Sequence, residues 1–177
     1  MKKVTYLTES AKKFSREEAI AEAKRCLLCE EAYCNKKCPI NSNPKEFVEL
    51  VATEQFDKAI GLIRDNNPLF YSICTRVCPY DSYCVGGCRN SKLADDPIMI
   101  PFIQKYLVDY CDETDEIISS GNVEPKKVGQ KVAIIGSGPA GLAAAAVLGQ
   151  KGYEVTVFEA KKEVGGWLSY GIPPHRL

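Results

Sequence analysis

Apolar residues in the first part of the chain recur at the spacing of short amphipathic helices. Ser15 and Glu18 form an S-x-x-E capping box, whose side chains can satisfy free backbone N–H groups at a helix start. This box predicts a helix from about Arg16 into Cys26. A second apolar pattern starts at Pro44 and a third at Phe56, and together they predict two short helices that pack against each other.

A further helix is predicted after Pro101, where apolar residues follow the i, i+3, i+4, i+7 spacing of one helical face. The residues of that face are Ile103, Tyr106, Leu107 and Tyr110. No segment before residue 120 alternates convincingly between apolar and polar residues, as a strand would. The N-terminal part is therefore predicted to be a mainly α domain, residues 1–118.

The pattern changes after a polar segment with glycine and proline, residues 119–130, which we interpret as a linker. Residues 131–135 form an apolar run typical of a buried strand, residues 139–151 an alanine-rich helix, and residues 154–158 a second strand. This order is one βαβ unit. We expect residues 131–177 to be the start of a Rossmann-type α/β domain.

Composition narrows the functional classes. The 23 basic residues of this 177-residue chain cancel 23 acidic ones, with no run of five like charges, so a nucleic-acid or polybasic membrane site is not expected. The longest apolar stretch, residues 132–148, contains glycines and a proline, which favours a soluble βα unit over a membrane span. Partners are therefore expected to be proteins and small molecules.

The chain contains nine cysteines and one histidine, His175. Its first residues, MKKVTYLTESAKKF, lack the apolar segment and cleavage site of a signal peptide, so we expect a cytoplasmic protein. Cytosolic reductants keep thiols reduced, which favours metal binding over disulfides. No catalytic side chain is predicted, because chemistry of this kind belongs to cofactors, and we expect His175 to lie on the surface.

Eight cysteines fall into two groups. The first reads Cys26-x2-Cys29-x4-Cys34-x3-Cys38-Pro, and the second comprises Cys74-x3-Cys78-Pro followed by Cys84-x3-Cys88. Close spacing lets one loop present several thiolates to one iron-sulfur cluster, and in two-cluster ferredoxins the cysteine before proline binds the other cluster. The first three thiols are thus predicted to share one 4Fe-4S cluster, with the thiol before Pro39 binding a second.

Two alternatives to iron remain open. Structural zinc also uses cysteine pairs, but usually two C-x2-C pairs or histidines, and only Cys26 and Cys29 have that spacing. Metal-free buried thiols are the other reading, and so many at regular intervals would be an unusual way to fill a core. Cys111 stands apart from both groups and is interpreted as an ordinary helix cysteine.

A G-x-G-x-x-G turn, residues 136–141, lies between the predicted strand and helix. The first glycine permits a tight turn, the second admits a pyrophosphate, and the third lets helix and strand pack closely, with the helix N-terminus facing the phosphates. Glu159 follows the second strand, where it can accept hydrogen bonds from a ribose and would disfavour the 2′-phosphate of NADP. Gly165, Gly166 and Trp167 are expected to approach the same ligand. The alternative is a plain turn.

The order of these motifs, with VAIIGSGPAGL and GGWLSYGIPPHRL, resembles the flavin and iron-sulfur subunits of bacterial NAD-dependent dihydropyrimidine dehydrogenases. Glutamate synthase small subunits are close relatives of that family. The resemblance covers nearly the whole chain. It implies an α-helical ferredoxin-like domain with two 4Fe-4S clusters, followed by an FAD-binding unit.

The resemblance also implies the ligands. One cluster would be held by Cys26, Cys29, Cys34 and Cys88, and the other by Cys38, Cys78, Cys84 and an unusual glutamine, Gln104, in the first turn of its helix. Cysteine counting alone makes Cys74 the eighth ligand, and we follow the resemblance, which leaves Cys74 without an iron. FAD is expected to contact the following residues: Gly136, Ser137, Gly138, Pro139, Ala140, Gly141, Glu159, Gly165, Gly166, Trp167 and Arg176.

Proteins of this kind pass electrons from NAD(P)H to FAD and through the clusters to a partner catalytic subunit. Pyrimidine reduction and glutamate synthesis differ in that partner, and Gln104 with the GGWL segment favours the former. Because the relatives continue beyond Leu177, we expect this chain to be a truncated piece that holds FAD weakly or not at all. The competing hypothesis is a protein-interaction domain whose metal only stabilises the fold, without a redox role.

Overall fold

The computed structural model of the chain describes residues 13–69, 71–114, 127–173 and 176. They fall into a helical unit, from residues 11–67 and 71–120, and a second unit that contains the described part of 121–177. Each unit is taken by itself. The predicted boundaries of 1–118, 119–130 and 131–177 stay a prediction, since residues 115–126 lie outside the described ranges. Within those ranges no helix is both long and apolar enough to cross a membrane.

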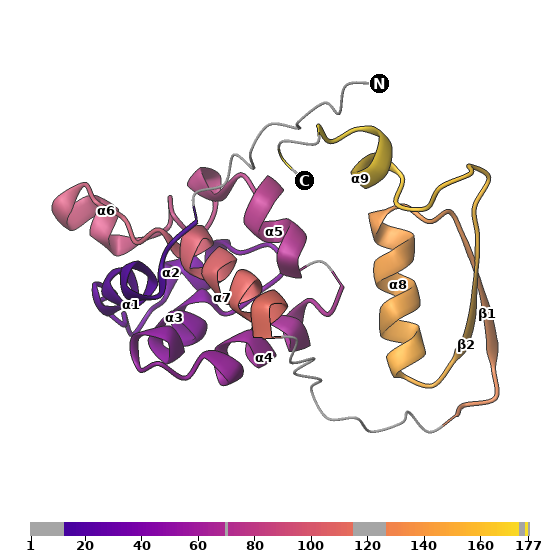
Figure 1. Cartoon of the computed structure of the whole chain (residues 1–177), viewed down its shortest axis with the longest axis horizontal. Helices are drawn as coiled ribbons and strands as arrows, with labels where there is room; N and C mark the ends of the chain where they lie inside the picture. The colour runs from indigo at the N-terminus through magenta and orange to yellow at the C-terminus, as the bar shows by residue number, and fades with distance from the viewer. Residues whose placement is uncertain (1–12, 70, 115–126, 174–175, 177) are drawn as a thin grey trace. The chain divides into compact units, whose positions relative to one another are not determined.

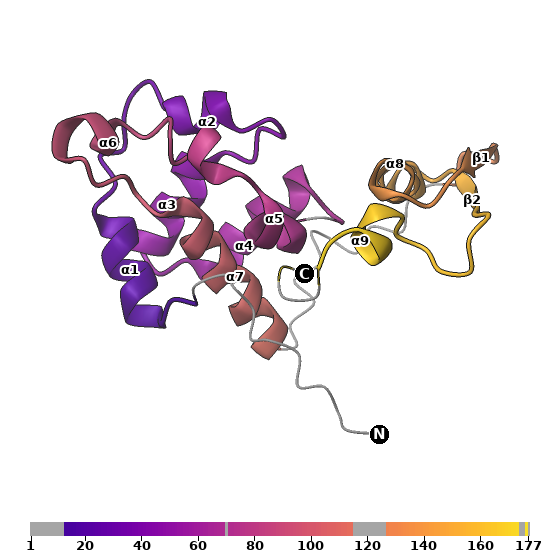
Figure 2. The same ribbon diagram turned by 90° about the horizontal axis from the view of Figure 1, so that it is seen from above.

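The helical unit contains seven α-helices and one 3₁₀ turn among its described residues (Figures 1 and 2). Their bounds are α1 Arg16–Lys24, α2 Tyr33–Lys37, α3 Pro44–Ala52, α4 Phe56–Asn66, α5 Tyr71–Val77, η1 Tyr80–Ser82, α6 Arg89–Ala94 and α7 Ile100–Thr114. The predicted helices after Ser15, Pro44, Phe56 and Pro101 are confirmed. The helices α2, α5 and α6 were not predicted, because five to seven residues are too few to show a helical period.

The capping box at α1 forms as predicted. The Glu18 amide donates to the Ser15 hydroxyl at 3.2 Å, and the Ser15 amide donates to the Glu18 carboxylate at 2.8 Å. The helix nevertheless ends at Lys24, so Cys26 lies in the loop that follows rather than inside the helix. From α1, Glu22 also reaches α7: its carboxylate accepts the Met99 amide at 2.8 Å, just before the helix begins.

The core lies where α3, α4 and α7 meet, with small residues of α1 against them. Phe47 of α3 and Ile60 of α4 are fully buried, as are Ile103 and Leu107 of α7. Two short helices packed together, expected after Pro44 and Phe56, are thus confirmed. Since α7 begins at Ile100, Gln104 is its fifth residue and lies in the second turn rather than the predicted first.

The second unit is a βαβ unit with one further short helix, α9 Trp167–Tyr170. Strands β1 (Lys131–Ile135) and β2 (Glu154–Phe158) pair in parallel, with Lys131 opposite Glu154 and Ile135 opposite Phe158. Helix α8 (Pro139–Gln150) connects them and contacts both. The predicted strands and the helix between them are confirmed, the helix ending one residue earlier than expected.

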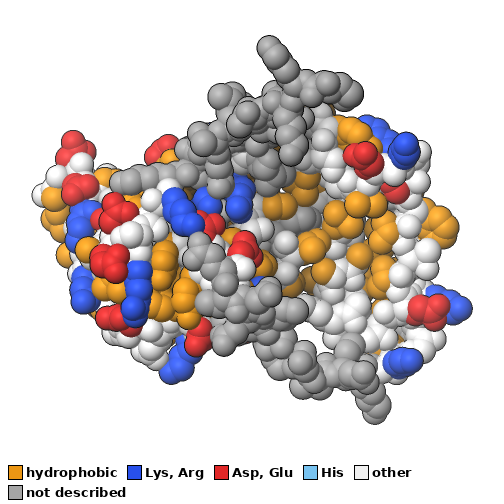
Figure 3. Space-filling view, viewed as in Figure 1, with side chains coloured by type: hydrophobic (Ala, Val, Ile, Leu, Met, Phe, Trp, Pro, Cys, Tyr) orange, Lys and Arg blue, Asp and Glu red, His pale blue; other side chains and the backbone are white. Residues whose placement is uncertain are grey.

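The prediction that the first strand is buried is wrong. Its residues alternate between exposed and half-buried, and Ile135 at its end is 83% exposed. In the described residues only β2 pairs with β1 and only α8 packs on the pair, so one face of each strand stays open. The visible face of this unit accordingly shows a group of hydrophobic side chains with few charges between them (Figure 3).

Candidate metal centres and dinucleotide turn

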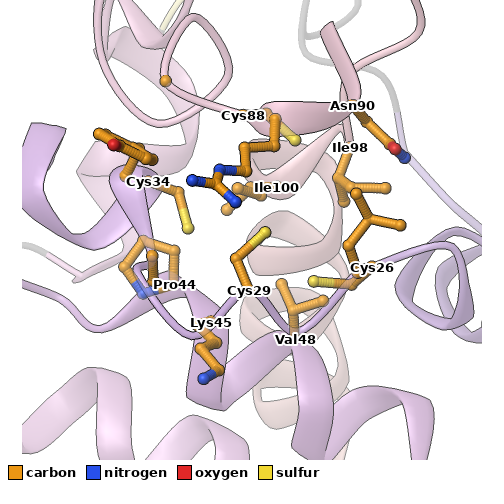
Figure 4. A pocket seen from close by; sticks show the side chains of 15 residues that line it. Cys26, Cys29, Cys34, Pro44, Lys45, Val48, Cys88, Asn90, Ile98 and Ile100 are labelled. Atoms are coloured by element: carbon orange, nitrogen blue, oxygen red, sulfur yellow. The ribbon is translucent and has the colours of Figure 1, made fainter. Parts of the chain in front are cut away.

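Four thiols line one cavity in the helical unit (Figure 4): Cys26, Cys29, Cys34 and Cys88. The first two lie in the loop after α1, the third in α2, and the fourth directly precedes α6. Their sulfur atoms surround the cavity, whose other walls include apolar side chains of α3 and of the start of α7. The structure therefore brings one distant cysteine to the three that are close in sequence.

Local hydrogen bonds hold these segments in place. The Asn35 side chain, next to Cys34, donates to the Asn43 side chain at 2.6 Å and accepts the Lys45 amide at 2.9 Å, which ties α2 to the start of α3. Between Cys26 and Cys29 the backbone turns through Leu28, whose φ of +46° is unusual for a residue with a side chain. That turn lets both cysteines of the C-x2-C pair face the cavity.

A second group of thiols comprises Cys38, Cys74, Cys78 and Cys84. Burial, followed by the charges of Cys78 and Cys38, raises the pKa of Cys84 to about 12 and that of Cys74 to about 11. Burial and the charge of Cys38 likewise raise the pKa of Cys78. These mutual effects place the four thiols near one another, although they come from the end of α2, from α5 and from the loop after η1.

Polar side chains contact the sulfur atoms of this second group. The Cys38 sulfur lies 3.2 Å from the Ser42 hydroxyl and accepts the Ser42 amide at 3.5 Å. Asn67 donates from its side-chain amide to the Cys74 sulfur at 3.4 Å. Neither residue was predicted. Ser42 follows the Cys-Pro motif closely enough to have been a candidate, whereas nothing in the sequence marks Asn67, seven residues before Cys74.

Gln104, the predicted eighth ligand, is only 8% exposed. Its side-chain nitrogen donates to the Tyr71 carbonyl at 3.1 Å, which directs the amide toward the start of α5. Cys74 lies one turn further along that helix. One candidate for the eighth position, Cys74, thus lies in α5, and the side chain of the other, Gln104 of α7, contacts the start of α5. The choice between them stays a prediction.

The donor set suits a multi-iron cluster. Thiolates are the ligands that 4Fe-4S clusters use, and partial burial keeps water from competing for them. Within the described ranges no three Cys, His, Asp or Glu side chains come close enough to hold a single ion. Burial raises the pKa of Cys34 to about 11; thiols of this kind are protonated at neutral pH and release protons when metal binds.

Cys111, expected to be an ordinary helix cysteine, lies in α7 and is buried in the core, 3% exposed.

The glycine-rich turn connects β1 to α8. Gly136 has a φ of +95°, which only glycine adopts readily. A Cβ atom on Gly141 would lie 2.1 Å from the Gly136 carbonyl oxygen, so the third glycine allows helix and strand to pack. Around Gly138 nothing lies within 4 Å of such an atom, which leaves open space at the second glycine. The backbone roles assigned to the first and third glycines agree with the structure, and the approach of a pyrophosphate at the second stays a prediction.

Glu159, at the end of β2, is bonded to this turn. Its carboxylate accepts the Ser137 hydroxyl at 2.5 Å and the Ser137 amide at 2.8 Å, and it also accepts the Lys161 amide at 2.8 Å. These hydrogen bonds, that of the Ser137 hydroxyl first, lower the pKa of Glu159 to about 2. Ser137 itself is fully buried. The expected hydrogen bond from Glu159 to a ribose stays untested.

The second glycine pair folds against the turn. The Gly165 amide donates to the Ser137 carbonyl at 3.0 Å, and a Cβ atom on Gly166 would lie 3.0 Å from Gly138 Cα. The close approach that these glycines allow is thus between two backbone segments. Trp167 follows with 79% of its surface exposed. Arg176 is exposed too, while His175 lies outside the described residues.

Two family descriptions match the chain. The family described as dihydropyrimidine dehydrogenase domain II, 4Fe-4S cluster, matches residues 3–116, more than half of the chain. The family described as an NAD(P)-binding Rossmann-like domain matches residues 134–174, the segment with the glycine-rich turn.

The alignments with curated relatives cover all or nearly all of this chain. The chain is 42% identical over 178 residues to the NAD-dependent dihydropyrimidine dehydrogenase subunit PreT of Escherichia coli (strain K12), and 41% identical over 178 residues to the PreT homolog of Salmonella typhi. Each alignment covers 100% of this chain and 42% of the relative. The glutamate synthase (NADPH) small chain of Azospirillum brasilense is 35% identical over 169 residues, 93% of this chain and 34% of that protein. The resemblance drawn from the motifs is confirmed, and the chain spans less than half the length of these relatives.

Proposed function

The chain belongs to the dihydropyrimidine dehydrogenase domain II, 4Fe-4S cluster family, and from this we propose that it is the electron-transfer module of an NAD(P)H-dependent flavin and iron-sulfur oxidoreductase. One observation carries the proposal: thiols from three separated segments line a single cavity. Cysteines gathered from distant parts of a chain into one desolvated space are what a cluster requires. A second group of thiols on the same unit supports a second cluster.

We assign the cluster ligands as follows. Cys26, Cys29, Cys34 and Cys88 would hold the first 4Fe-4S cluster. Cys38, Cys78, Cys84 and Gln104 would hold the second, with Cys74 the rival for the fourth position. Support for Gln104 comes from its burial and from the anchoring of its nitrogen by Tyr71, which leaves the amide oxygen as the atom able to bind iron. Support for Cys74 comes from its electrostatic contact with Cys38 and Cys78.

An electrostatic interaction between the two thiol groups supports their acting as one pathway. The charge of Cys34, in the first group, contributes to raising the pKa of Cys84, in the second. When bound, the clusters would supply one-electron transfer. This chain's own residues hold them adjacent and partly shielded from water, which also tunes their potentials.

The glycine-rich turn is proposed to bind a dinucleotide, FAD in the first instance. The open space at Gly138 supports the approach of a pyrophosphate, and the Glu159 carboxylate disfavours a 2′-phosphate. Arg176 would pair with a phosphate. A bound ribose would compete with Ser137 for Glu159, since both need the same carboxylate.

The relatives named subunits of dihydropyrimidine dehydrogenase support a partner catalytic subunit that receives the electrons. A glutamate synthase module is the second candidate, favoured by 35% identity to such a small chain. Both candidates share the same electron-transfer role and differ only in the final acceptor.

Oxygen-free purification followed by iron, acid-labile sulfide and flavin analysis tests the proposal. We expect about eight iron atoms per chain, from two four-iron clusters, and a visible absorption that dithionite bleaches. Iron that dithionite cannot reduce would instead favour the interaction-domain hypothesis. A colourless preparation with zinc in place of iron would refute the cluster assignment.

A further inference from the structure

A cavity with a strongly basic lining lies on the surface of the helical unit, beside the proposed first cluster. Its volume is about 470 Å³. Residues of α2 and of the loop and first turns of α6 line it: Tyr33, Lys37, Gly86, Gly87, Cys88, Arg89 and Lys92. Helix α6 lies at the edge of this unit in both views (Figures 1 and 2). Cys88 is thus shared between this outer cavity and the thiol-lined one within.

The walls of the cavity are closely fitted. A Cβ atom on Gly87 would lie 2.9 Å from Lys37 Cγ and 3.2 Å from the Tyr33 carbonyl oxygen. Only glycine at this position lets the loop before α6 approach α2 so closely. The methylene stem of Lys37 is therefore packed against the loop, and Lys37 lines the cavity.

Three of the lining residues are cationic, and none is acidic. Within the described part of the chain, Lys37, Arg89 and Lys92 take part in no ion pair. Glu31 binds Lys36, accepts the Tyr33 hydroxyl at 2.9 Å and interacts electrostatically with Arg89, but it does not line the cavity. Three positive charges thus line one cavity that has no acidic residue in its walls, in a chain whose net charge is zero.

Side chains around the cavity favour a protein ligand over a nucleotide. The Tyr33 ring contacts Arg89 at 5.3 Å and Lys36 at 5.6 Å from its centroid, so it holds cations instead of offering a face to a base. Leu93 next to Lys92 is 73% exposed. An exposed apolar side chain among cations is typical of protein interfaces, which combine apolar contacts with a charged rim.

We propose that Lys37, Arg89 and Lys92 form a docking surface for acidic side chains of the redox partner, which they place beside Cys88. The inference rests on the proposed function, because docking beside Cys88 brings a partner close to a redox centre only if Cys88 binds a cluster. Complementary charge steers association and fixes the orientation of two proteins. A partner docked at this cavity would be separated from the first proposed cluster only by Cys88, the proposed ligand that lines both cavities.

Binding of a fluorescent poly-L-glutamate peptide to the iron-loaded chain, measured by anisotropy at low salt, tests this surface. The test variant carries Lys37→Gln, Arg89→Gln and Lys92→Gln. The matched control carries Lys127→Gln, Lys151→Gln and Lys162→Gln, three exposed lysines of the second unit, and loses the same charge. A third variant, Lys37→Arg with Lys92→Arg, keeps the charge at the cavity.

We expect the test variant to bind the peptide roughly tenfold more weakly, the sum of three exposed charge pairs, while the control and the arginine variant bind as the unchanged protein does. Equal weakening in test and control variants would overturn the proposal. So would displacement of the peptide by inorganic phosphate at matched ionic strength, since the cavity would then take small anions. Iron analysis of each sample keeps the two conclusions apart: absence of iron refutes the proposed function, whereas normal iron with equal binding refutes the docking surface alone.

Discussion

Replacing Cys88 by alanine tests the first proposed cluster independently of the second. In the proposed assignment Cys88 is the one ligand of the first cluster that comes from outside residues 26–34, so its loss would leave three thiols for that cluster and all ligands of the second. We expect iron to fall from about eight to about four atoms per chain. Cys111→Ala is the matched control, because this cysteine is buried in α7 and belongs to neither thiol group; its iron content should not change.

The same substitution has a calculable effect on stability. A cluster that joins Cys34 to Cys88 closes a loop of about 54 residues, and by analogy with a disulfide such a link lowers the entropy of the unfolded chain by an amount worth about 4 kcal/mol. Cys88→Ala should lower the free energy of unfolding by up to that amount in oxygen-free urea titrations. Full iron content in Cys88→Ala, with an unchanged unfolding midpoint, would refute the grouping of Cys88 with the first three thiols.

Five further substitutions test other parts of the structure. Gln104→Ala should lower the iron content of the second cluster and Cys74→Ala should not; the reverse result in iron analysis would make Cys74 the eighth ligand. Phe47→Ala should cost about 3–5 kcal/mol in urea unfolding, because this side chain is fully buried between α3 and α4. Ser15→Ala should cost about 1 kcal/mol in the same assay, through loss of the helix cap. Glu159→Gln should lower the free energy of unfolding above pH 4.5, the ordinary pKa of the carboxyl. The difference from the unchanged chain should vanish as the pH falls toward about 2, where the carboxylate of the folded chain becomes protonated. A difference that does not depend on pH would contradict the hydrogen bonds to Ser137.

The elements that the sequence predicted are those whose signal is local and long. The capping box at Ser15 marks a helix start within four residues. The apolar faces of α3 and α4 and the βαβ pattern span enough residues to show a period. Helices of five to seven residues do not, and α2, α5 and α6 were missed for that reason. The burial of β1 was overestimated because an apolar run in the sequence shows only that a strand is able to be buried. Its actual exposure depends on which strands and helices pack against it.

The parts of the site that could be predicted are those whose residues lie close together in the sequence. The spacing of Cys26, Cys29 and Cys34 pointed to one cluster, because a short loop can bring three thiols together. That Cys88 completes this group came from family resemblance, since spacing does not tell which distant segment folds back. The bond between Ser137 and Glu159 was not foreseen, because it depends on the way β2 ends beside the turn.

The physics of the helical unit also bears on the choice between an electron carrier and a scaffold. Helices as short as α2, α5 and α6 are unstable alone, yet they hold or adjoin half of the eight predicted ligands. The thiols that these helices bring together are partly buried, and burial raises the pKa of Cys34 and of Cys84. Cluster binding would therefore contribute directly to folding. Structural stabilisation thus accompanies any redox role here, so loss of fold on iron removal does not decide between the two hypotheses. Only reversible reduction of the bound iron does.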